Sequence, residues 1–164
     1  MIISVRNKTY EDLKKELGEE DRIVVWACNV CSKFCGVGGR ENMNALADKL
    51  EQDGYTVIRR ELIGMSCLLD LVRKRKSDEA TARIFEEATA IIPLTCEDGY
   101  DDVKYVFKDK KVIKVTKTLG LGIFSLEKGM LLTYPFEDTG LKPSVEGIPI
   151  KEAAEKLGYY AGPY

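Results

Sequence analysis

The chain has 164 residues, 45% of them hydrophobic and 32% charged, with 27 acidic and 25 basic residues and a net charge of −2. This balance favours neither nucleic acid nor an anionic membrane as a partner, and no apolar run is long enough to span a bilayer. The sequence contains no histidine, which excludes Ser-His-Asp and Cys-His catalytic arrangements and every metal site that uses imidazole.

Apolar runs alternate with amphipathic segments along the first two thirds of the chain. The run at 22–27 is apolar almost throughout, which is typical of a strand buried on both faces. Pro93 lies inside a later run and is unusual in a strand, because proline cannot donate a hydrogen bond to its neighbour. In chain order, the pattern predicts a helix at 9–18, strand 22–27, helix 40–53, strand 55–60, helices 68–76 and 77–88, strand 90–96, helix 99–107, strand 111–116, a hairpin or ordered loop at 119–134 and a helix at 150–157.

Strand and helix alternate four times at the spacing of βαβ units. We therefore predict a three-layer α/β fold with a mainly parallel, four-stranded sheet of the Rossmann or flavodoxin-like kind. We expect a single domain over residues 1–164, with its core at about 20–117 and a C-terminal extension at 118–164. The N-terminus has no secretion signal, so we expect a cytoplasmic protein.

The five cysteines occupy positions that this fold would bring to one edge of the sheet. Cys28, Cys31 and Cys35 follow directly on the first strand, and Cys67 and Cys96 lie just past the second and third strands. Ligands of open α/β sheets bind at the carboxyl ends of the strands. Clustered cysteines of odd number in a reducing compartment indicate metal or redox chemistry rather than disulfides. The sequence therefore predicts a metal–thiolate site at this edge.

The spacing of the cysteines favours an iron–sulfur cluster, most simply [4Fe–4S]. Three cysteines in one short segment and two single remote ones suit a cluster better than zinc, which commonly uses two C-x₂₋₄-C pairs. The glycine-rich segment 36–39 supplies backbone N–H groups for an anionic centre. Cys96 is predicted as a substitute ligand or as a neighbour that tunes the centre. The predicted metal ligands are Cys28, Cys31, Cys35 and Cys67.

Two other classes of protein fit the same residues. A Cys₄ zinc domain would act as a structural or interaction module. A thiol oxidoreductase would use Cys28 and Cys31 as a C-x-x-C pair. In either class, Cys96 is also explained as a small buried hydrophobic residue. These alternatives remain open at the level of the sequence.

The order of these motifs resembles the N-terminal iron–sulfur domain of MetV-type proteins. These are small subunits associated with methylenetetrahydrofolate reductase in anaerobic one-carbon metabolism. The likeness covers about residues 24–128, roughly two thirds of the chain. It is carried by Val24-Val-Trp-Ala-Cys-Asn-Val-Cys-Ser-Lys-Phe-Cys-Gly-Val-Gly-Gly39, Met65-Ser-Cys67, Pro93-Leu-Thr-Cys96 and Gly120-Leu-Gly-Ile123.

The resemblance implies an electron-transfer or accessory subunit without a complete active site of its own. Its partner would be the flavin-containing catalytic subunit of methylenetetrahydrofolate reductase, or a corrinoid or methyltransferase protein. Members of the family continue into a further cysteine-rich segment, whereas residues 131–140 here contain no cysteine and none follows. The resemblance therefore implies a divergent, stand-alone member with a regulatory, assembly or single-centre role. The implied cluster ligands are Cys28, Cys31, Cys35, Cys67 and Cys96.

Overall fold

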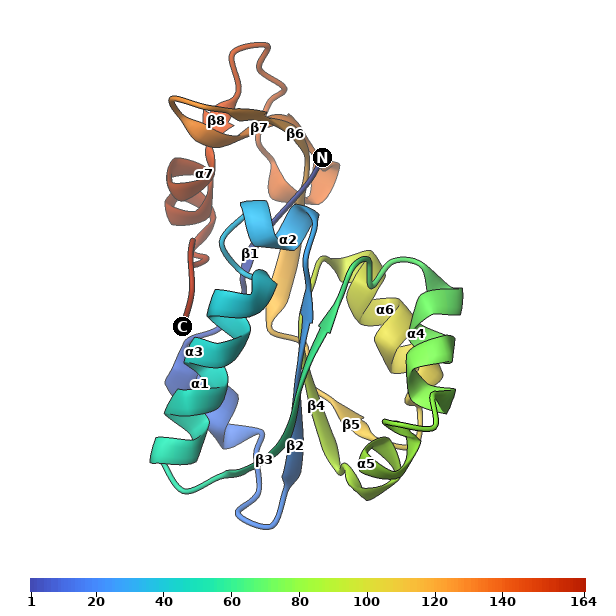
Figure 1. The fold of residues 1–164 in the computed structure, drawn as a ribbon. Helices are drawn as coiled ribbons and strands as arrows, with labels where there is room; N and C mark the ends of the chain where they lie inside the picture. Colours follow the sequence, from blue (N-terminus) through green and yellow to red (C-terminus); the bar gives the residue numbers. More distant parts are fainter.

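The parallel sheet that the sequence predicts is present in the computed structural model, which describes all 164 residues (Figure 1). Its four strands pair in the order β3-β2-β4-β5, and each neighbouring pair is parallel. The apolar run 23–27 is completely buried in this sheet, as expected of a strand covered on both faces. The strands are β2 (Arg22–Cys28), β3 (Thr56–Ile63), β4 (Ala90–Leu94) and β5 (Lys111–Val112).

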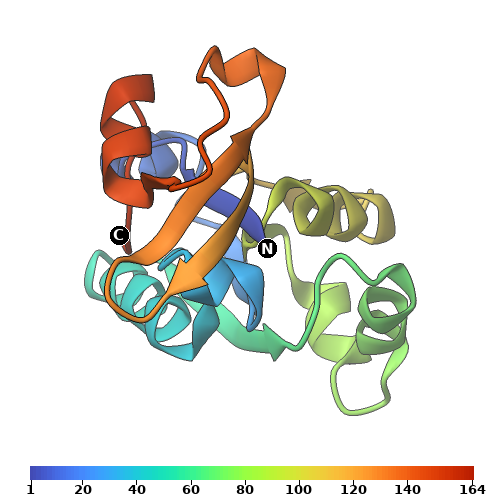
Figure 2. The same ribbon diagram turned by 90° about the horizontal axis from the view of Figure 1, so that it is seen from above.

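Helices cover both faces of the parallel sheet, as Figures 1 and 2 show. On one face, Leu13 and Leu46 belong to a buried cluster with the apolar side chains of β2 and β4. On the other face, the rings of Trp26, Phe85 and Phe107 have centroids 5.1–6.0 Å apart at the centre of a second cluster. The helices are α1 (Tyr10–Lys15) and α3 (Gly39–Gln52) on the first face, and α4 (Leu69–Ser77), α5 (Ala82–Glu87) and α6 (Glu97–Val106) on the second.

Pro93 lies within β4 without interrupting the hydrogen bonds of the sheet. The N–H group of Ile113 donates to the carbonyl oxygen of Ile91 at 2.9 Å, so alternate residues of β4 direct their backbone groups toward β5. β5 ends at Val112, and its pairing with β4 stops at Ile91. The nitrogen of Pro93 therefore faces a side where no strand continues, and its missing N–H leaves no acceptor unpaired.

A second, antiparallel sheet adjoins the parallel one, and the sequence pattern did not predict it as a sheet. Its strands pair in the order β1-β6-β7-β8. The hairpin predicted at 119–134 is confirmed as β6 and β7, but the first residues of the chain also form a strand that pairs with β6. The predicted strand 111–116 is divided, since β5 ends at Val112 and β6 begins at Thr116. The strands are β1 (Ile2–Arg6), β6 (Thr116–Ser125), β7 (Gly129–Pro135) and β8 (Ile148–Pro149).

A glycine lets β1, β6 and β7 approach one another closely. A Cβ atom added at Gly122 would lie 2.0 Å from the carbonyl oxygen of Leu131 and 2.7 Å from Cδ1 of Ile3. Non-bonded atoms do not pack at such distances, so only glycine fits between these strands. Close backbone packing therefore explains the glycine at this position of the Gly120-Leu-Gly-Ile segment.

The antiparallel sheet has its own helix and its own hydrophobic cluster. α7 (Ile150–Leu157) covers the predicted range 150–157 and is followed by Gly158, which has a φ of 71°. Ala153 and Ala154 of this helix are buried in one cluster with Ile3 of β1. None of the helices combines the length and the apolar character needed to cross a membrane. The remaining elements are α2 (Cys31–Phe34) and the short 3₁₀ helix η1 (Glu137–Thr139).

Candidate functional site

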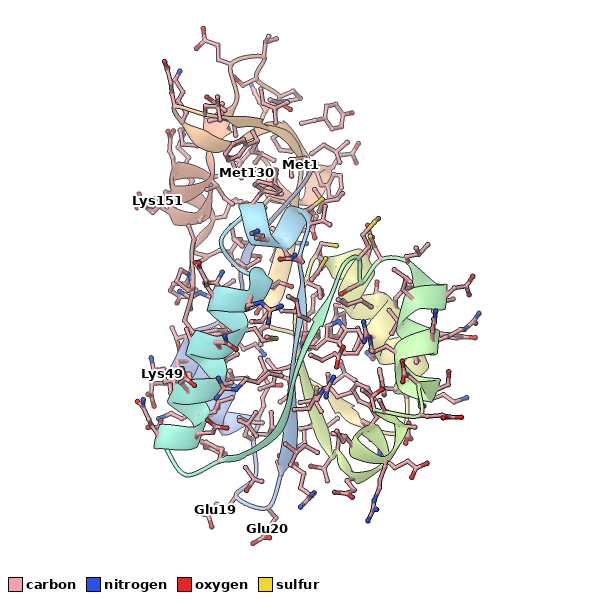
Figure 3. The ribbon with its side chains drawn as sticks, in the orientation of Figure 1. Met1, Glu19, Glu20, Lys49, Met130 and Lys151 are labelled. Atoms are coloured by element: carbon pink, nitrogen blue, oxygen red, sulfur yellow. The ribbon has the colours of Figure 1, made fainter.

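The carboxyl ends of β3, β2 and β4 are neighbours at one edge of the parallel sheet. Cys28 is the last residue of β2, Cys67 lies in the loop after β3, and Cys96 immediately precedes α6. Figure 3 shows sulfur atoms gathered at this end of the sheet, close to α2. The fold therefore brings together cysteines from three adjacent strand ends.

The turn between β2 and α2 carries Cys28 and Cys31. The thiol of Cys28 lies 3.6 Å from the carbonyl oxygen of Gly64, in the loop after β3. The hydroxyl group of Ser32 donates to the backbone oxygen of Cys28 at 3.0 Å, which fixes the geometry of the turn. Cys28 is buried, whereas Cys31, the first residue of α2, is half-buried. The first cysteine therefore contacts the loop that contains Cys67.

The loop that carries Cys67 is fixed in place at Ser66. The indole N–H of Trp26 donates to the hydroxyl oxygen of Ser66 at 2.9 Å, and both residues are completely buried. Ser66 also packs on the first turn of α6, where a Cβ atom added at Gly99 would lie 2.8 Å from the Cβ of Ser66. The neighbouring Cys67 is exposed. Its loop is therefore held between β2 and α6 while its thiol remains accessible.

A buried ion pair holds the far side of the same loop. The side chain of Glu61, on β3, is 2% exposed and lies 2.8 Å from Nε of Arg59 and 3.0 Å from Nε of Arg75. Arg75 belongs to α4, which begins directly after the loop. Two guanidinium groups offset the burial of this carboxylate. The ion pair therefore joins the strand before Cys67 to the helix after it.

The thiols at this edge are close enough for their charges to influence one another. Burial raises the pKa of Cys67, and the nearby thiol of Cys28 and carboxylate of Asp98 raise it further. Burial also raises the pKa of Cys96 to about 12, the backbone N–H of Gly99 opposes this effect, and charges on Cys67 and Cys28 add to it. Cys67 and Cys96 are therefore protonated at neutral pH, and a metal that binds them must displace their protons.

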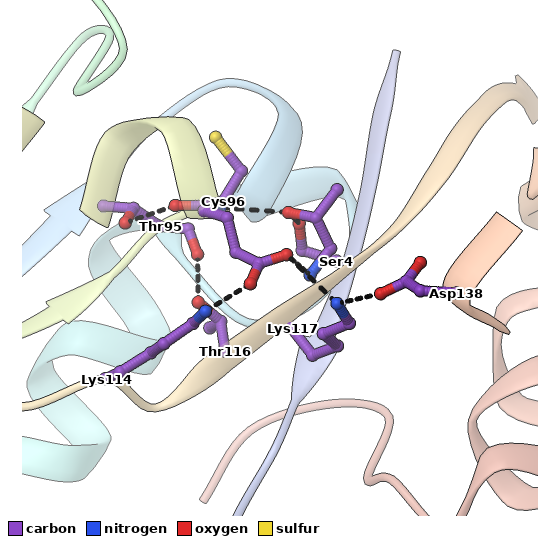
Figure 4. Close-up of polar contacts among 9 residues, drawn as sticks. Ser4, Thr95, Cys96, Lys114, Thr116, Lys117 and Asp138 are labelled. Atoms are coloured by element: carbon purple, nitrogen blue, oxygen red, sulfur yellow. Dashed lines mark hydrogen bonds and ion pairs between the residues drawn. The ribbon is translucent and has the colours of Figure 1, made fainter. Parts of the chain in front are cut away.

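Hydrogen bonds to β6 hold Cys96 at the start of α6 (Figure 4). The hydroxyl of Thr116 donates to the backbone oxygen of Thr95 at 2.6 Å, and the hydroxyl of Thr95 donates to the backbone oxygen of Cys96 at 2.9 Å. The N–H of Glu97 donates to Oγ1 of Thr118 at 2.9 Å, and the N–H of Thr118 donates to Oε2 of Glu97 at 3.0 Å. The antiparallel sheet therefore fixes the backbone on both sides of Cys96.

Two lysines surround the carboxylate of Glu97. Lys114 forms an ion pair with it, and Nζ of Lys117 lies 3.6 Å from Oε2 of Glu97 and 2.5 Å from Oδ2 of Asp138. Burial disfavours ionisation of Glu97, but the hydrogen bonds from Lys114 and Thr118 outweigh it and lower the pKa of the carboxyl group. Glu97 is therefore negatively charged, and the contact between α6 and β6 is an ionic one.

The structure places the thiol of Cys35 against β1. The N–H of Ser4 donates to the sulfur of Cys35 at 3.4 Å, and the thiol donates to the carbonyl oxygen of Ile2 at 3.4 Å. Cys35 is 3% exposed and belongs to the hydrophobic cluster of the antiparallel sheet. Burial raises its pKa to about 11. The sequence predicts this residue as a metal ligand, whereas in the structure its thiol joins the end of α2 to the first strand.

The donor set fits a group that is bound by sulfur alone. Cys28, Cys31, Cys67 and Cys96 lie at one edge of the parallel sheet, and the sequence offers no imidazole as a competing ligand. Soft thiolate ligands select zinc and iron–sulfur clusters. All five cysteines are free thiols, and no three Cys, Asp or Glu side chains are arranged to hold a metal ion as they stand.

Several residues that build the site were not predicted from the sequence. The structure adds Trp26, Ser66 and Gly99, which position the Cys67 loop, and Glu97 and Thr118, which position Cys96. Only Trp26 gives a signal in the sequence, because a tryptophan in a buried aliphatic strand needs an acceptor for its indole N–H. The other contacts join segments whose proximity depends on the tertiary fold.

The fold and the site define an α/β protein with cysteines at the carboxyl edge of a parallel sheet and with an adjoining antiparallel sheet. No family model, curated protein or solved structure matches this chain.

Proposed function

We propose that this chain is an iron–sulfur protein that holds a [4Fe–4S] cluster at the carboxyl edge of its parallel sheet. The observation that carries the proposal is the placement of Cys28, Cys67 and Cys96 at or just past three adjacent strand ends, with Cys31 at the start of α2 beside Cys28. Sulfur-only donors suit both zinc and iron–sulfur clusters. One C-x₂-C pair followed by single remote cysteines favours the cluster.

The surroundings of the cysteines suit an anionic centre. α6 is ten residues long and has Cys96 at its N-cap. The N-terminus of a helix carries partial positive charge, which stabilises negative groups beside it. Hydrogen bonds to the sulfurs and solvent exposure set the reduction potential of a cluster. A bound cluster would supply one-electron transfer.

We further propose that the chain serves methylenetetrahydrofolate reduction in the cytoplasm of an anaerobe, as an electron-transfer or accessory subunit. The motif at residues 24–39 supports this role through its resemblance to MetV-type proteins. The partner would be the catalytic subunit of the reductase, or a corrinoid or methyltransferase protein. Exposed apolar side chains near the cysteines support contact with another protein, since such surfaces mark interaction sites. They are Val30, Phe34, Met65 and Leu68, each 36–48% exposed.

Purification in the absence of oxygen tests the cluster directly. We expect a coloured protein with about four iron atoms and four sulfides per chain, and an electron paramagnetic resonance signal after reduction with dithionite. A colourless protein that contains zinc and unfolds with chelator would instead identify a Cys₄ zinc domain. A metal-free protein in which Cys28 and Cys31 cycle between dithiol and disulfide would identify a thiol oxidoreductase.

The role in methylenetetrahydrofolate reduction needs a separate test. The loaded protein is mixed anaerobically with the reductase catalytic subunit of the same organism, and the visible absorption of the cluster and of the flavin is followed. Electron exchange between the two centres and co-elution of the two chains are the expected results. A cluster that neither exchanges electrons with the flavin nor co-elutes with the subunit would refute this role and leave the iron–sulfur proposal intact.

A further inference from the structure

We infer that Cys96 is the fourth ligand of the proposed centre, together with Cys28, Cys31 and Cys67, and that Cys35 is instead a structural thiol that joins α2 to β1. The inference rests on the proposed metal centre. It departs from the ligand set that the sequence favours, in which Cys35 completes the site. Cys35 and Cys96 differ in the contacts that their side chains make.

The side chain of Cys35 already contacts the antiparallel sheet. Its sulfur accepts the N–H of Ser4 and its thiol donates to the carbonyl oxygen of Ile2, both at 3.4 Å. These two backbone groups belong to β1, the edge strand of the antiparallel sheet. The side chain is also packed among apolar residues such as Val37 and Leu119. Ligation by Cys35 would therefore leave two backbone groups of β1 without a partner and open a cavity in this cluster.

Cys96 lies at the same edge of the sheet as the other three cysteines. It follows β4, which pairs directly with β2 and so ends beside Cys28. The first turn of α6 packs on the Cys67 loop, because Gly99 has no side chain to hold Ser66 away. Cys96 is buried at this contact and makes no side-chain hydrogen bond to a backbone oxygen, in contrast to Cys35. Its thiol is therefore available to a metal without the loss of such a bond.

The backbone around Cys96 is held in place before any metal binds. Thr95 and Glu97, on either side of it, are bonded to Thr116 and Thr118 of β6. A ligand on a backbone that is fixed by hydrogen bonds loses less conformational freedom on binding than one on a loose loop. Cys96 thus provides a fixed point at the site, and the exposed Cys67 completes it from the opposite loop.

Cysteine variants reconstituted anaerobically with iron and sulfide test this assignment. We expect Cys35→Ala to bind as much iron and sulfide per chain as the unmodified protein, with the same signal after reduction. We expect Cys96→Ser and Cys67→Ser each to retain less than half of the iron. Far-UV circular dichroism confirms that each variant is folded. If Cys35→Ala does not fold, Cys35→Ser replaces it, because its hydroxyl group can bond to the same groups of β1.

A folded Cys35 variant that loses the iron, or a Cys96→Ser variant that keeps all of it, would overturn the assignment. Titration of the metal-free protein with Co²⁺ separates this failure from that of the iron–sulfur proposal, since thiolate-to-cobalt charge-transfer absorption reports thiolate ligands whatever the native metal. Cobalt absorption that survives in Cys35→Ala and is lost in Cys96→Ser supports the assignment even if the protein proves to bind zinc. Unmodified protein that binds neither iron nor cobalt would refute both proposals.

Discussion

Trp26 and Gly99 both contact Ser66, in the loop that carries Cys67. The indole N–H of Trp26 bonds to Ser66, and the bare backbone of Gly99 leaves space for the Cβ of Ser66. A buried indole without an acceptor would cost about 1–3 kcal/mol, so Ser66 satisfies Trp26 while it fixes the Cys67 loop. Trp26, Ser66 and Gly99 thus position the exposed Cys67, although none of the three is a proposed metal ligand.

Gly99→Ala tests this arrangement. The new methyl group would lie 2.8 Å from the Cβ of Ser66 and 3.0 Å from the Cβ of Thr95. Alanine is the better helix former by about 1 kcal/mol, but overpacking of a buried contact costs about 1–3 kcal/mol. We expect the free energy of unfolding to fall, as measured by urea denaturation, and the metal content to fall with it because the Cys67 loop is displaced.

Gly64→Ala is the matched control for this substitution. Gly64 lies in the same loop, its φ is not positive, and a Cβ atom there would meet no atom within 4 Å. We expect its free energy of unfolding to stay within about 0.5 kcal/mol of the original value, with unchanged metal content. Equal losses in the two variants would show that the contact of Gly99 with Ser66 is not what positions the loop.

At the scale of elements, Glu97 is the residue that joins α6 to β6. It accepts the N–H of Thr118, its own N–H donates to the Thr118 hydroxyl, and its carboxylate pairs with Lys114 and Lys117. Its pKa in the folded protein is lowered below the ordinary value of 4.5. A carboxyl group with a lowered pKa stabilises the fold above the unfolded value, and this stabilisation is lost as the pH falls through the folded value.

Glu97→Gln should therefore change both the stability and its dependence on pH. We expect the free energy of unfolding at neutral pH to fall by about 1–2 kcal/mol, because a charged hydrogen-bond acceptor becomes neutral. Below pH 4.5 the difference between the two proteins should shrink, because the carboxyl group of the unfolded chain binds a proton first and the folded carboxyl group follows only at its lowered pKa. Urea denaturation across this range measures both effects. Glu127→Gln, on the exposed hairpin turn, is the control and should change neither.

The parallel half of the fold could be predicted from the sequence, because its elements are continuous in the chain and each carries a clear pattern. The run 23–27 is apolar and buried, and Met43, Leu46, Ala47 and Leu50 repeat at helical spacing. β1 could not be predicted in the same way. It is a five-residue strand whose partner, β6, is distant in the sequence.

The contacts of Cys35 with β1 could not be predicted, for the same reason. The placement of cysteines at the ends of β2, β3 and β4 depends only on the parallel sheet, and the sequence was sufficient for it. The surroundings of Cys35 depend on β1, which supplies both of its hydrogen-bond partners. Spacing alone groups Cys35 with Cys31, and only the antiparallel sheet distinguishes the two residues. No pattern in the sequence links Ser4 to Cys35.

At the scale of the whole molecule, β1 couples the antiparallel sheet to α2. Ile3 is completely buried, and its side chain packs beside Gly122 of β6. Ile3→Ala should lower the free energy of unfolding by about 2–5 kcal/mol, as is usual for a buried isoleucine. We also expect Cys35 to react faster with an alkylating reagent, because a loosened β1 no longer covers its thiol. Urea denaturation and mass spectrometry of the alkylated protein measure these effects.

Ile123→Ala is the control, since Ile123 lies in the same sheet but is half exposed. Its stability should change by no more than about 0.5 kcal/mol, and the reactivity of Cys35 should be unaltered. If Ile3→Ala destabilised the protein but left the alkylation rate of Cys35 unchanged, the proposed coupling between β1 and this thiol would be wrong.

The pairing of β1 with β6 also has a consequence for biosynthesis. Ser4 contacts Thr118, 114 residues further along the chain, so β1 cannot pair with β6 until the ribosome has made the chain at least as far as Thr118. Contacts between distant segments close a long loop and form slowly. We therefore expect the nascent chain to assemble its βαβ units first. β1 would then dock after the parallel sheet has formed, once the segment that carries Cys28, Cys31, Cys35, Cys67 and Cys96 has been translated.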